Sequence, residues 1–299
     1  MVLTCHGNDI QKLSEIGYGM RLDPRLDTLI TAAVRQASGL VAIGSDVRAE
    51  YLSMGVPPDR IADLPNGINA SLLADRDPAA KGRLGLPEDA LALLAVGRNH
   101  PKKGFAFLLE AMRRVVDRDA KVVCVLVGAR VPELQTRVDA LGLADRVFLF
   151  GPAPPVGVQF GDEQGAEART DTYFHAADVF VMPSLIESFG LVTVEALAAG
   201  LPVVAMDAEG ARDLLADSPS IRLVKDRTPE ALAAALLSLV ERIRSKPRLG
   251  RANPELAARY DRRRVAEQHV NFYRVVLERL ASSAEQRPVA KELSSNLPT

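Results

Sequence analysis

The sequence predicts an α/β protein whose strands form parallel sheets and whose chain is divided into two domains. Strands and helices are predicted to alternate from residue 91 onward, which is typical of a parallel sheet covered by helices. The strands are continuous apolar runs, such as LALLAV at residues 91–96, and such runs indicate burial on both faces of the sheet. With 299 residues the chain exceeds what one hydrophobic core usually supports, so two domains are expected.

Three strands and two helices are predicted in the first part of the chain. The strands span residues 2–5, 39–43 and 60–64, and the helices span residues 26–37 and 46–54, with Ser45 as the N-cap of the second helix. Residues 69–87 are polar and contain Pro and Gly, so the domain boundary is placed there. Residues 1–73 are therefore expected to form the first domain and residues 74–261 the second.

The second part of the chain is predicted to continue the alternation. Its strands span residues 91–96, 122–127, 146–150, 179–182, 202–206 and 221–224, and its helices span residues 105–116, 132–141, 191–199, 211–216 and 229–243. Residues 151–172 read as one long Gly-, Pro- and acid-rich loop, and loops of this length are usually functional or mobile. An amphipathic helix over residues 262–280 is expected to precede a disordered tail at residues 281–299.

Composition and charge argue against several classes of function. Lys and Arg total 37 against 38 Asp and Glu, and the net charge of -1 gives no basis for expecting nucleic-acid binding. Cys5 and Cys124 lie far apart without metal-ligand spacing, so we expect small buried thiols in a reducing, cytoplasmic setting. The sequence shows no export signal and no run of about 18 uncharged apolar residues, so neither export nor a membrane span is expected.

Residues 182–205, MPSLIESFGLVTVEALAAGLPVVA, are predicted to contain a strand end, a loop, a helix and a second strand. Glu187 lies in the loop, and Glu195 lies within the first two turns of the helix. The first turn of a helix offers free backbone N–H groups and a partial positive charge, which suit a phosphate or a sugar hydroxyl, and Gly190 lets a ligand approach closely. Taken alone, the two glutamates are explained equally well as solvated charges on a helix.

Two cations follow the strand at residues 91–96. Arg98 comes directly after the strand end, and Lys103 comes five residues later, just before the next helix. Because the carboxyl ends of parallel strands lie at one edge of a sheet, we expect both cations near the glutamate motif. A diphosphate needs such cations where no metal is present, Arg as a fork and Lys as a point charge. Each of them alone fits a surface cation, and only the combination favours a pocket for phosphates and hydroxyls.

Familiar motifs of other enzyme classes are absent from the chain. The chain contains none of four motifs: GxGxxG, GxxxxGK[ST], HExxH and GxSxG. No motif therefore supports a dinucleotide-binding protein, a P-loop protein, a zincin or a hydrolase with a nucleophile elbow. His100, His175 and His269 are expected to be ordinary structural or exposed histidines. His6 directly follows the first strand, where a parallel-sheet protein places ligand-facing residues, although a structural role is the commoner one for a lone histidine.

Several spaced motifs resemble those of one known family. They are SGLVAIGS at residues 38–45, PNGIN at 65–69, GRNHPKKG at 97–104, ESFGLVTVE at 187–195 and AGLPVVA at 199–205. In this order they resemble the retaining nucleotide-sugar glycosyltransferases of glycosyltransferase family 4. The resemblance implies a GT-B fold, which has two Rossmann-like domains with parallel sheets, and here an incomplete first domain. It also implies that the helix at residues 262–280 returns to complete the first domain.

The resemblance also implies roles for individual residues. Arg98 and Lys103 would bind the donor diphosphate, and Glu195 would hydrogen-bond the ribose hydroxyls. His6 and Glu187 would form the catalytic pair, because both would border the transferred sugar, one from each domain. Backbone N–H groups of four consecutive residues would meet the sugar and the distal phosphate: Phe189, Gly190, Leu191 and Val192. Ser188 would also belong to the donor-binding residues.

The chemistry that the resemblance implies is transfer of a hexosyl group from a UDP- or GDP-sugar to an acceptor hydroxyl, with retention of configuration. It requires no metal and no cofactor beyond the nucleotide-sugar donor. The acceptor is expected to be a glycan, a lipid or a small molecule, and peripheral association with the inner face of a membrane is left open.

The chain also departs from the family pattern. Members of the family have further strands and a glycine-rich loop ahead of the segment that matches residue 1, so an N-terminally truncated chain is expected. Glu209 stands where a glycine is usual, Asp213 stands where Glu is commoner, and residues 151–172 fall near the expected base site. Two alternatives stay open: a nucleotide-sugar-binding module without turnover, and a GT-B isomerase or phosphorylase.

Overall fold

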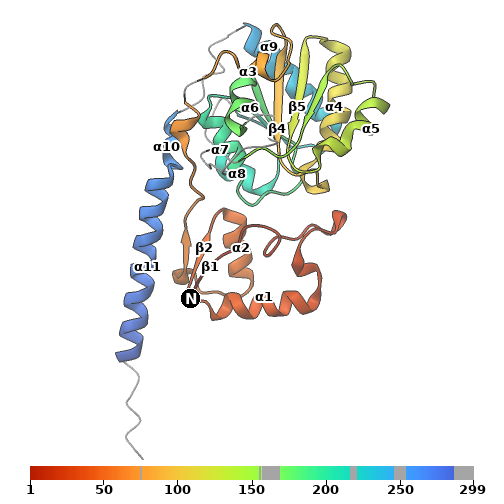
Figure 1. Cartoon of the computed structure of the whole chain (residues 1–299). Coiled ribbons are helices and arrows are strands. Elements are labelled where there is room, and N and C mark those ends of the chain that lie inside the picture. The colour runs from red at the N-terminus through yellow and green to blue at the C-terminus, as the bar shows by residue number, and fades with distance from the viewer. Residues whose placement is uncertain (75, 155, 157–168, 216–220, 246–253, 286–299) are drawn as a thin grey trace, which may run out of the picture.

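The computed structural model describes residues 1–74, 76–154, 156, 169–215, 221–245 and 254–285. Its named strands form two sheets, and every strand pairing within them is parallel. The predicted α/β class with two parallel sheets is therefore confirmed. Figure 1 shows the two sheets in two separate lobes of the molecule, with the long C-terminal helix α11 running beside the first of them.

The first sheet contains β1 (Val2–Thr4), β2 (Gly39–Ala42) and β3 (Ile61–Asp63) in that order. Two helices connect these strands, α1 (Pro24–Gln36) and α2 (Ser45–Ser53). The prediction that Ser45 caps α2 is wrong, because the N-cap is Gly44, which forms no side-chain cap. The backbone N–H of Ser45 instead donates to the carboxylate of Asp213 at 2.5 Å, so a residue outside the first sheet stabilises this helix end.

The second sheet has the strand order β6-β5-β4-β7-β8-β9. Its strands are β4 (Leu91–Val96), β5 (Val122–Val127), β6 (Val147–Phe150), β7 (Val179–Met182), β8 (Val203–Met206) and β9 (Ile221–Val224). Successive residues of β4 pack into two different cores, Leu93 on one face and Leu94 on the other. Both faces are buried, which is why these strands are apolar along their whole length.

Helices cover both faces of the second sheet (Figure 1). One core contains side chains of α4 (Phe105–Arg118), α5 (Gln135–Ala140) and α9 (Pro229–Ser245). The other contains side chains of α3 (Ala80–Arg83), α6 (Thr170–Ala176), α7 (Leu191–Ala198) and α8 (Glu209–Leu215). The chain runs outward from β4 to β6 and then, in the opposite direction, from β7 to β9. The carboxyl ends of β4 and β7 therefore form the switch point, where open sheets of this kind bind ligands.

The end of the chain returns to the first sheet. After α10 (Pro254–Arg259) the backbone of Ile68 bonds to Tyr260 and Arg262 at 2.8 and 2.9 Å. Helix α11 (Arg262–Glu285) then packs Phe272 and Val276 toward the core that holds β2. Neither α11 nor any other helix within the described ranges is long and apolar enough to cross a membrane.

Two sequence predictions about irregular segments need correction. Residues 281–285 were expected to begin a disordered tail, but they continue α11, and the hydroxyls of Ser282 and Ser283 bond to carbonyls one turn earlier. Residues 170–172 were assigned to the long loop, but they begin α6, because burial of Tyr173 and Phe174 against the sheet stabilises a helix there. The other residues of the predicted tail, 286–299, and most of the predicted loop, 155 and 157–168, lie outside the described residues.

Candidate functional site

The predicted site residues lie on two loops that leave the switch point, one after β4 and one after β7. The first loop ends in a short 3-10 helix, Pro101–Lys103, and at Gly104, which has a φ of 65°. The backbone N–H of Leu185 in the second loop donates to the carbonyl of Lys102 at 2.7 Å. A Cβ on Gly104 would lie 1.9 Å from the carbonyl oxygen of Pro183, so the two loops are in direct backbone contact. These contacts fix the two loops relative to each other, and with them the side chains that the loops carry.

An ion pair joins these loops. The Nζ of Lys103 lies 2.5 Å from the Oε2 of Glu187, and the two side chains are only 18% and 8% exposed. The Oγ of Ser184 lies 3.5 Å from the same carboxylate oxygen. Arg98 is exposed on the first loop and lines a cavity together with Lys103. The structure thus brings together three residues that the sequence singled out, from positions that are almost 90 residues apart in the chain.

Helix α7 begins four residues after Glu187. Gly190 is its N-cap in the left-handed conformation, with φ 83° and ψ 53°. The backbone N–H groups of Leu191 and Val192 belong to the first turn, where a helix provides no internal acceptors. Ser188 and Phe189 are buried, and the ring of Phe189 packs edge-on against Tyr260 at 5.6 Å. The helix start therefore offers backbone donors and a partial positive charge next to a carboxylate.

Glu195 lies one turn further along α7 and is half-buried. Burial raises the pKa of its carboxyl to about 7, and within the described ranges no charged or hydrogen-bonding partner offsets that effect. A carboxyl with this pKa is about half ionised at neutral pH. In its ionised form it can accept hydrogen bonds from the hydroxyl groups of a ligand.

His6 contributes to the site through its backbone. Its carbonyl accepts a hydrogen bond from the Oγ of Ser188 at 2.7 Å, and its N–H donates to the carboxylate of Asp9 at 3.0 Å. The residue itself is exposed. The Ser188 hydroxyl is therefore engaged in a contact between the loop after β1 and the loop after β7, and the expected contact of Ser188 with the donor stays a prediction.

A cavity of about 400 Å³ opens between the loop after β1 and the loop after β4. It is lined by Asn8, Gly17, Tyr18, Arg98, His100, Lys102 and Lys103. Sequence reasoning assigned no role here to Tyr18 or Lys102, and it treated His100 as an ordinary histidine. The only sequence signal for Lys102 and His100 was their proximity to Lys103, and Tyr18 lies 84 residues away from Lys102 in the chain.

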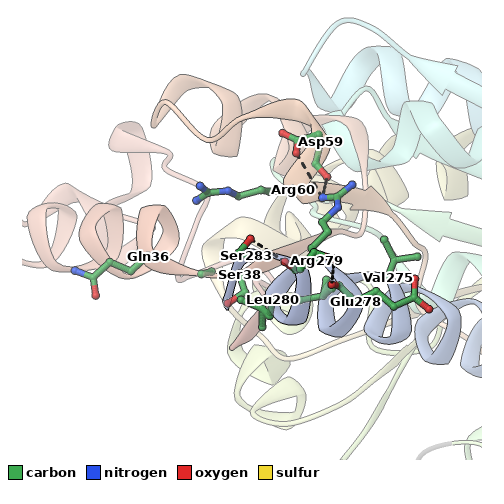
Figure 2. A pocket seen from close by; sticks show the side chains of 12 residues that line it. Gln36, Ser38, Asp59, Arg60, Val275, Glu278, Arg279, Leu280 and Ser283 are labelled. Atoms are coloured by element: carbon green, nitrogen blue, oxygen red, sulfur yellow. Dashed lines mark hydrogen bonds and ion pairs between the residues drawn. The ribbon is translucent and has the colours of Figure 1, made fainter. Parts of the chain in front are cut away.

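A larger cavity of about 640 Å³ lies away from these residues (Figure 2). It is bordered by α11 and by residues that precede β2 and β3, among them Ser38 and Asp59. Figure 2 shows Arg279 of α11 reaching the backbone and side chain of Asp59 across it. This cavity lies at the amino ends of the first sheet, whereas parallel sheets bind ligands at their carboxyl ends. We therefore place the candidate site at the smaller cavity and the switch point.

The arrangement at the switch point can bind an anion and hydroxyl groups side by side. Arg98 and Lys103 provide positive charge, α7 provides backbone donors, and Glu187 and Glu195 provide acceptors. Over the described ranges of the chain, no three His, Cys, Asp or Glu side chains are grouped so that they could hold a metal ion. The predicted independence from metals stays a prediction.

Two curated proteins are similar to this chain in sequence. D-inositol 3-phosphate glycosyltransferase of Geodermatophilus obscurus is 32% identical over 300 residues, which cover 96% of this chain and 63% of that protein. Phosphatidyl-myo-inositol mannosyltransferase of Mycobacterium leprae is 33% identical over 240 residues, which cover 80% of this chain and 59% of that protein. The chain thus spans less than two thirds of the length of these curated relatives.

A solved structure and a family model agree with this similarity. The crystal structure of HepE from Anabaena in complex with UDP-glucose superimposes with a TM-score of 0.73 at 22% identity, covering 94% of this chain and 72% of that one. This likeness supports the GT-B fold that the sequence motifs implied. Residues 90–242, half of the chain, match the family model named Glycosyl transferases group 1. The chain belongs to the group 1 glycosyl transferases.

Proposed function

We propose that this protein transfers a hexosyl group from a nucleoside-diphosphate sugar to an acceptor hydroxyl, with retention of configuration and without a metal, as in glycosyltransferase family 4. The observation that carries the proposal is the Lys103–Glu187 ion pair at the switch point. Arg98 lines the same cavity as Lys103, and α7 begins four residues after Glu187. A cation and a carboxylate held together at a strand edge can separate when a ligand brings both a phosphate and a hydroxyl.

In this proposal the diphosphate is bound by Arg98, Lys103 and the start of α7. Arg98 offers a planar fork for phosphate oxygens, and Lys103 adds a point charge. The backbone N–H groups of Leu191 and Val192 add donors on the side of the distal phosphate, supported by the helix dipole. Gly190 permits the left-handed backbone that begins this helix, with a φ of 83°, a conformation that other residues rarely adopt.

Glu187 and Lys103 would exchange partners when the donor binds. In the unliganded chain they neutralise each other at 2.5 Å. When the diphosphate approaches, Lys103 moves its charge toward the phosphate, and the Glu187 carboxylate becomes free to accept hydrogen bonds from sugar hydroxyls. The pair thus prevents an unpaired charge from being buried in the empty site, which would cost several kcal/mol, typically about 3–5.

Retention follows in this proposal from attack on the same face that the diphosphate leaves. The leaving diphosphate develops negative charge, which Arg98, Lys103 and α7 stabilise, and one of its oxygens accepts the proton of the attacking hydroxyl. Donors preorganised at this position act most strongly because the loops hold them without rearrangement. His6 lies on the opposite loop, and its backbone contact with Ser188 keeps the two sides of the site together.

Glu195 gives the first expected result, a dependence of stability on pH. Its pKa is about 7 in the folded chain and about 4.5 when exposed, so between these values the folded chain keeps a proton that the unfolded chain releases. Stability contributed by this group therefore falls as the pH rises from 4.5 to 7, by roughly 3 kcal/mol at about 1.4 kcal/mol per unit. Glu195→Gln should abolish that fall, while Glu241→Gln, an exposed glutamate on α9, should not.

Urea unfolding of wild type and both variants at several pH values from 4.5 to 8 measures this difference. The Glu195→Gln chain should gain stability relative to wild type as the pH rises, and it should bind UDP more weakly at pH 8, where the carboxylate would accept the ribose hydroxyls. Parallel stability curves for Glu195→Gln and wild type would show that the carboxyl is not held protonated by burial.

Donor binding and transfer test the proposed function itself. UDP or GDP at 100 times its dissociation constant should add about 2.7 kcal/mol to the free energy of unfolding, which thermal unfolding detects as a raised Tm. Radiolabelled UDP-glucose and GDP-mannose, each with a mixture of hydroxyl acceptors, should then give a labelled product with the anomeric configuration of the donor. No Tm shift with either nucleotide would contradict the donor site. Nucleotide binding without transfer and without slow donor hydrolysis would favour the alternative of a binding module.

The names and structures of similar proteins support this proposal in general terms. Both curated relatives are named as enzymes that transfer a glycosyl or mannosyl group, and HepE was solved with UDP-glucose. These names include two different sugars, mannose and glucose, and they do not establish which nucleotide this chain binds. The test therefore includes both UDP and GDP.

A further inference from the structure

Ser188, the residue after Glu187, contacts the ends of two strands of the first sheet. Its hydroxyl donates to the carbonyl of His6, which follows β1, and the residue is only 5% exposed. Its own carbonyl oxygen lies 2.8 Å from the position that a Cβ on Gly44 would take, and Gly44 follows β2. That distance is shorter than ordinary van der Waals contact, so the backbone of Gly44 touches the loop after β7. The first sheet therefore meets the loop that carries Glu187 at two points.

The start of α2 has a further contact, with α8. The backbone N–H of Ser45 donates to the carboxylate of Asp213 at 2.5 Å, and a Cβ on Gly44 would lie 3.2 Å from the same carboxylate. A helix start carries a partial positive charge, so a carboxylate stabilises it. We call Gly44, Ser45, Ser188 and Asp213 the α2 seat. It joins the first lobe, which holds the first sheet, to the second lobe, which holds the second sheet.

The α2 seat borders a cavity of about 370 Å³ whose walls come from both lobes. Leu64 lines it from the first lobe, Phe189 from the second, and Tyr260 from the segment in which the chain returns to the first lobe. The chain thus crosses between the lobes beside a space that side chains do not fill. Lobes rotate against each other at such crossing segments, so the contacts of the seat determine how far the lobes close on this side.

The seat shares no residue with the contacts proposed for the diphosphate and the ribose. Arg98, Lys103 and Glu195 all belong to the second lobe, and so does the start of α7. His6, in contrast, belongs to the first lobe, whereas Glu187 belongs to the second. A change in the spacing of the lobes therefore changes the distance between His6 and Glu187, but it leaves the contacts to the diphosphate in place.

We infer that Gly44 and Asp213 are positioning residues for sugar transfer, because they seat α2 against the second lobe and thereby fix the distance between His6 and Glu187. This inference rests on the proposed function and goes beyond it, since it separates residues that space the lobes from residues that bind the donor. Displacement of a reacting group by about 1 Å can lower a rate about 100-fold. A change in the seat should therefore lower kcat for transfer while the affinity for UDP stays the same.

Gly44→Ala inserts a methyl group between the lobes. Gly44 has φ −165° and ψ 166°, an extended backbone that alanine also adopts, so the variant causes no backbone strain within the first lobe. The new Cβ would meet the carbonyl of Ser188, which is backbone and cannot rotate away. The lobes must then move apart, and kcat for transfer from a radiolabelled donor should fall about 10- to 100-fold, with the dissociation constant of UDP within about twofold of wild type.

Gly82→Ala is the matched control, because a Cβ there would meet only the end of the Glu88 side chain. Its kcat and its dissociation constant for UDP should both equal those of wild type.

Asp213→Ala removes the other contact of the seat without adding bulk. Loss of a capping carboxylate should lower kcat about 2- to 30-fold, and Asp213→Asn, which keeps an acceptor oxygen, should lower it by less. Because Gly44→Ala already separates the seat, the double variant Gly44→Ala/Asp213→Ala should lose less than the product of the two single losses. Asp117→Ala, which removes an exposed carboxylate on α4, should change nothing.

Hydrogen exchange measures the seat without any substrate. The backbone N–H of Ser45 should exchange about 2- to 30-fold faster in Asp213→Ala than in wild type, because it loses its acceptor. The backbone of β5, in the core of the second sheet, should exchange at the same rate in both chains.

Three results would overturn the inference: an unchanged exchange rate at Ser45 in Asp213→Ala, an unchanged kcat in Gly44→Ala, and a loss of UDP affinity as large as the loss of kcat, which would assign the seat to donor binding. If wild type neither binds UDP or GDP nor transfers a sugar, the proposed function is wrong. The exchange rate at Ser45 still decides in that case whether the seat joins the lobes, so the two failures are distinguishable.

Discussion

Lys103→Met is expected to raise the dissociation constant for UDP by about 100-fold or more. Two effects add in the same direction. The variant loses a charge-assisted contact to the diphosphate, typically about 1.5–3 kcal/mol, and it leaves the Glu187 carboxylate without its cation in a nearly buried position beside the phosphates. Isothermal titration of UDP onto wild type and variant measures the change. A dissociation constant within about threefold of wild type would show that Lys103 does not meet the diphosphate.

The same variant should also destabilise the unliganded chain, because removal of one partner from a buried ion pair costs about 3–5 kcal/mol. The double variant Lys103→Met/Glu187→Gln separates the two consequences. Its stability should recover, since no unpaired carboxylate remains, but its affinity for UDP should stay low. Recovery of both properties would mean that the weak binding of the single variant came only from misfolding. Lys121→Met serves as the control for loss of an exposed lysine.

Gly104→Ala is expected to lower the free energy of unfolding by about 2–5 kcal/mol. The residue has a φ of 65°, which costs an L-residue about 1–2 kcal/mol, and its new Cβ would lie 1.9 Å from the carbonyl oxygen of Pro183. That neighbour is backbone and cannot rotate away, so the two loops of the site must separate. Overpacking of this kind typically adds a further 1–3 kcal/mol.

Gly85→Ala is the matched control for this prediction. Gly85 has the same φ of 65°, but no atom lies within 4 Å of the Cβ position. Its replacement should cost only the backbone term, about 1–2 kcal/mol. Urea unfolding of both variants therefore isolates the contact between Gly104 and Pro183. Equal losses in the two variants would mean that the loops after β4 and β7 are not packed as described, and UDP binding by Gly104→Ala would then be normal.

The strands of the second sheet were the most predictable part of the fold. β4, β5 and β7 have the predicted bounds, because each is a continuous apolar run ended by Gly or Pro. The local sequence pattern predicted helix ends less well where a residue far away in the chain makes the deciding contact. Ser45 has the chemistry of an N-cap, but Asp213 supplies the acceptor at that helix start from 168 residues away. Ala281–Glu285 lies beyond the predicted helix, yet its serines bond back to the preceding turn.

The candidate site was predictable only in part, for a similar reason. Arg98, Lys103 and Glu187 could be placed together because each follows a strand of one parallel sheet, and strand ends share an edge. Tyr18 could not, since it lies in a loop of the first sheet and no sequence period relates that loop to the second sheet. Lys102 and Lys103 are neighbours in the chain, but they face different partners, Tyr18 and Glu187. Only the folded chain distinguishes their roles.

A crystal structure of the chain with UDP tests the central claim most directly. The account predicts that the diphosphate lies within hydrogen-bond distance of Arg98 and Lys103, with the Lys103–Glu187 pair opened and the ribose hydroxyls on Glu195. UDP bound in the cavity beside α11, or at the switch point with the Lys103–Glu187 pair intact, would contradict the account.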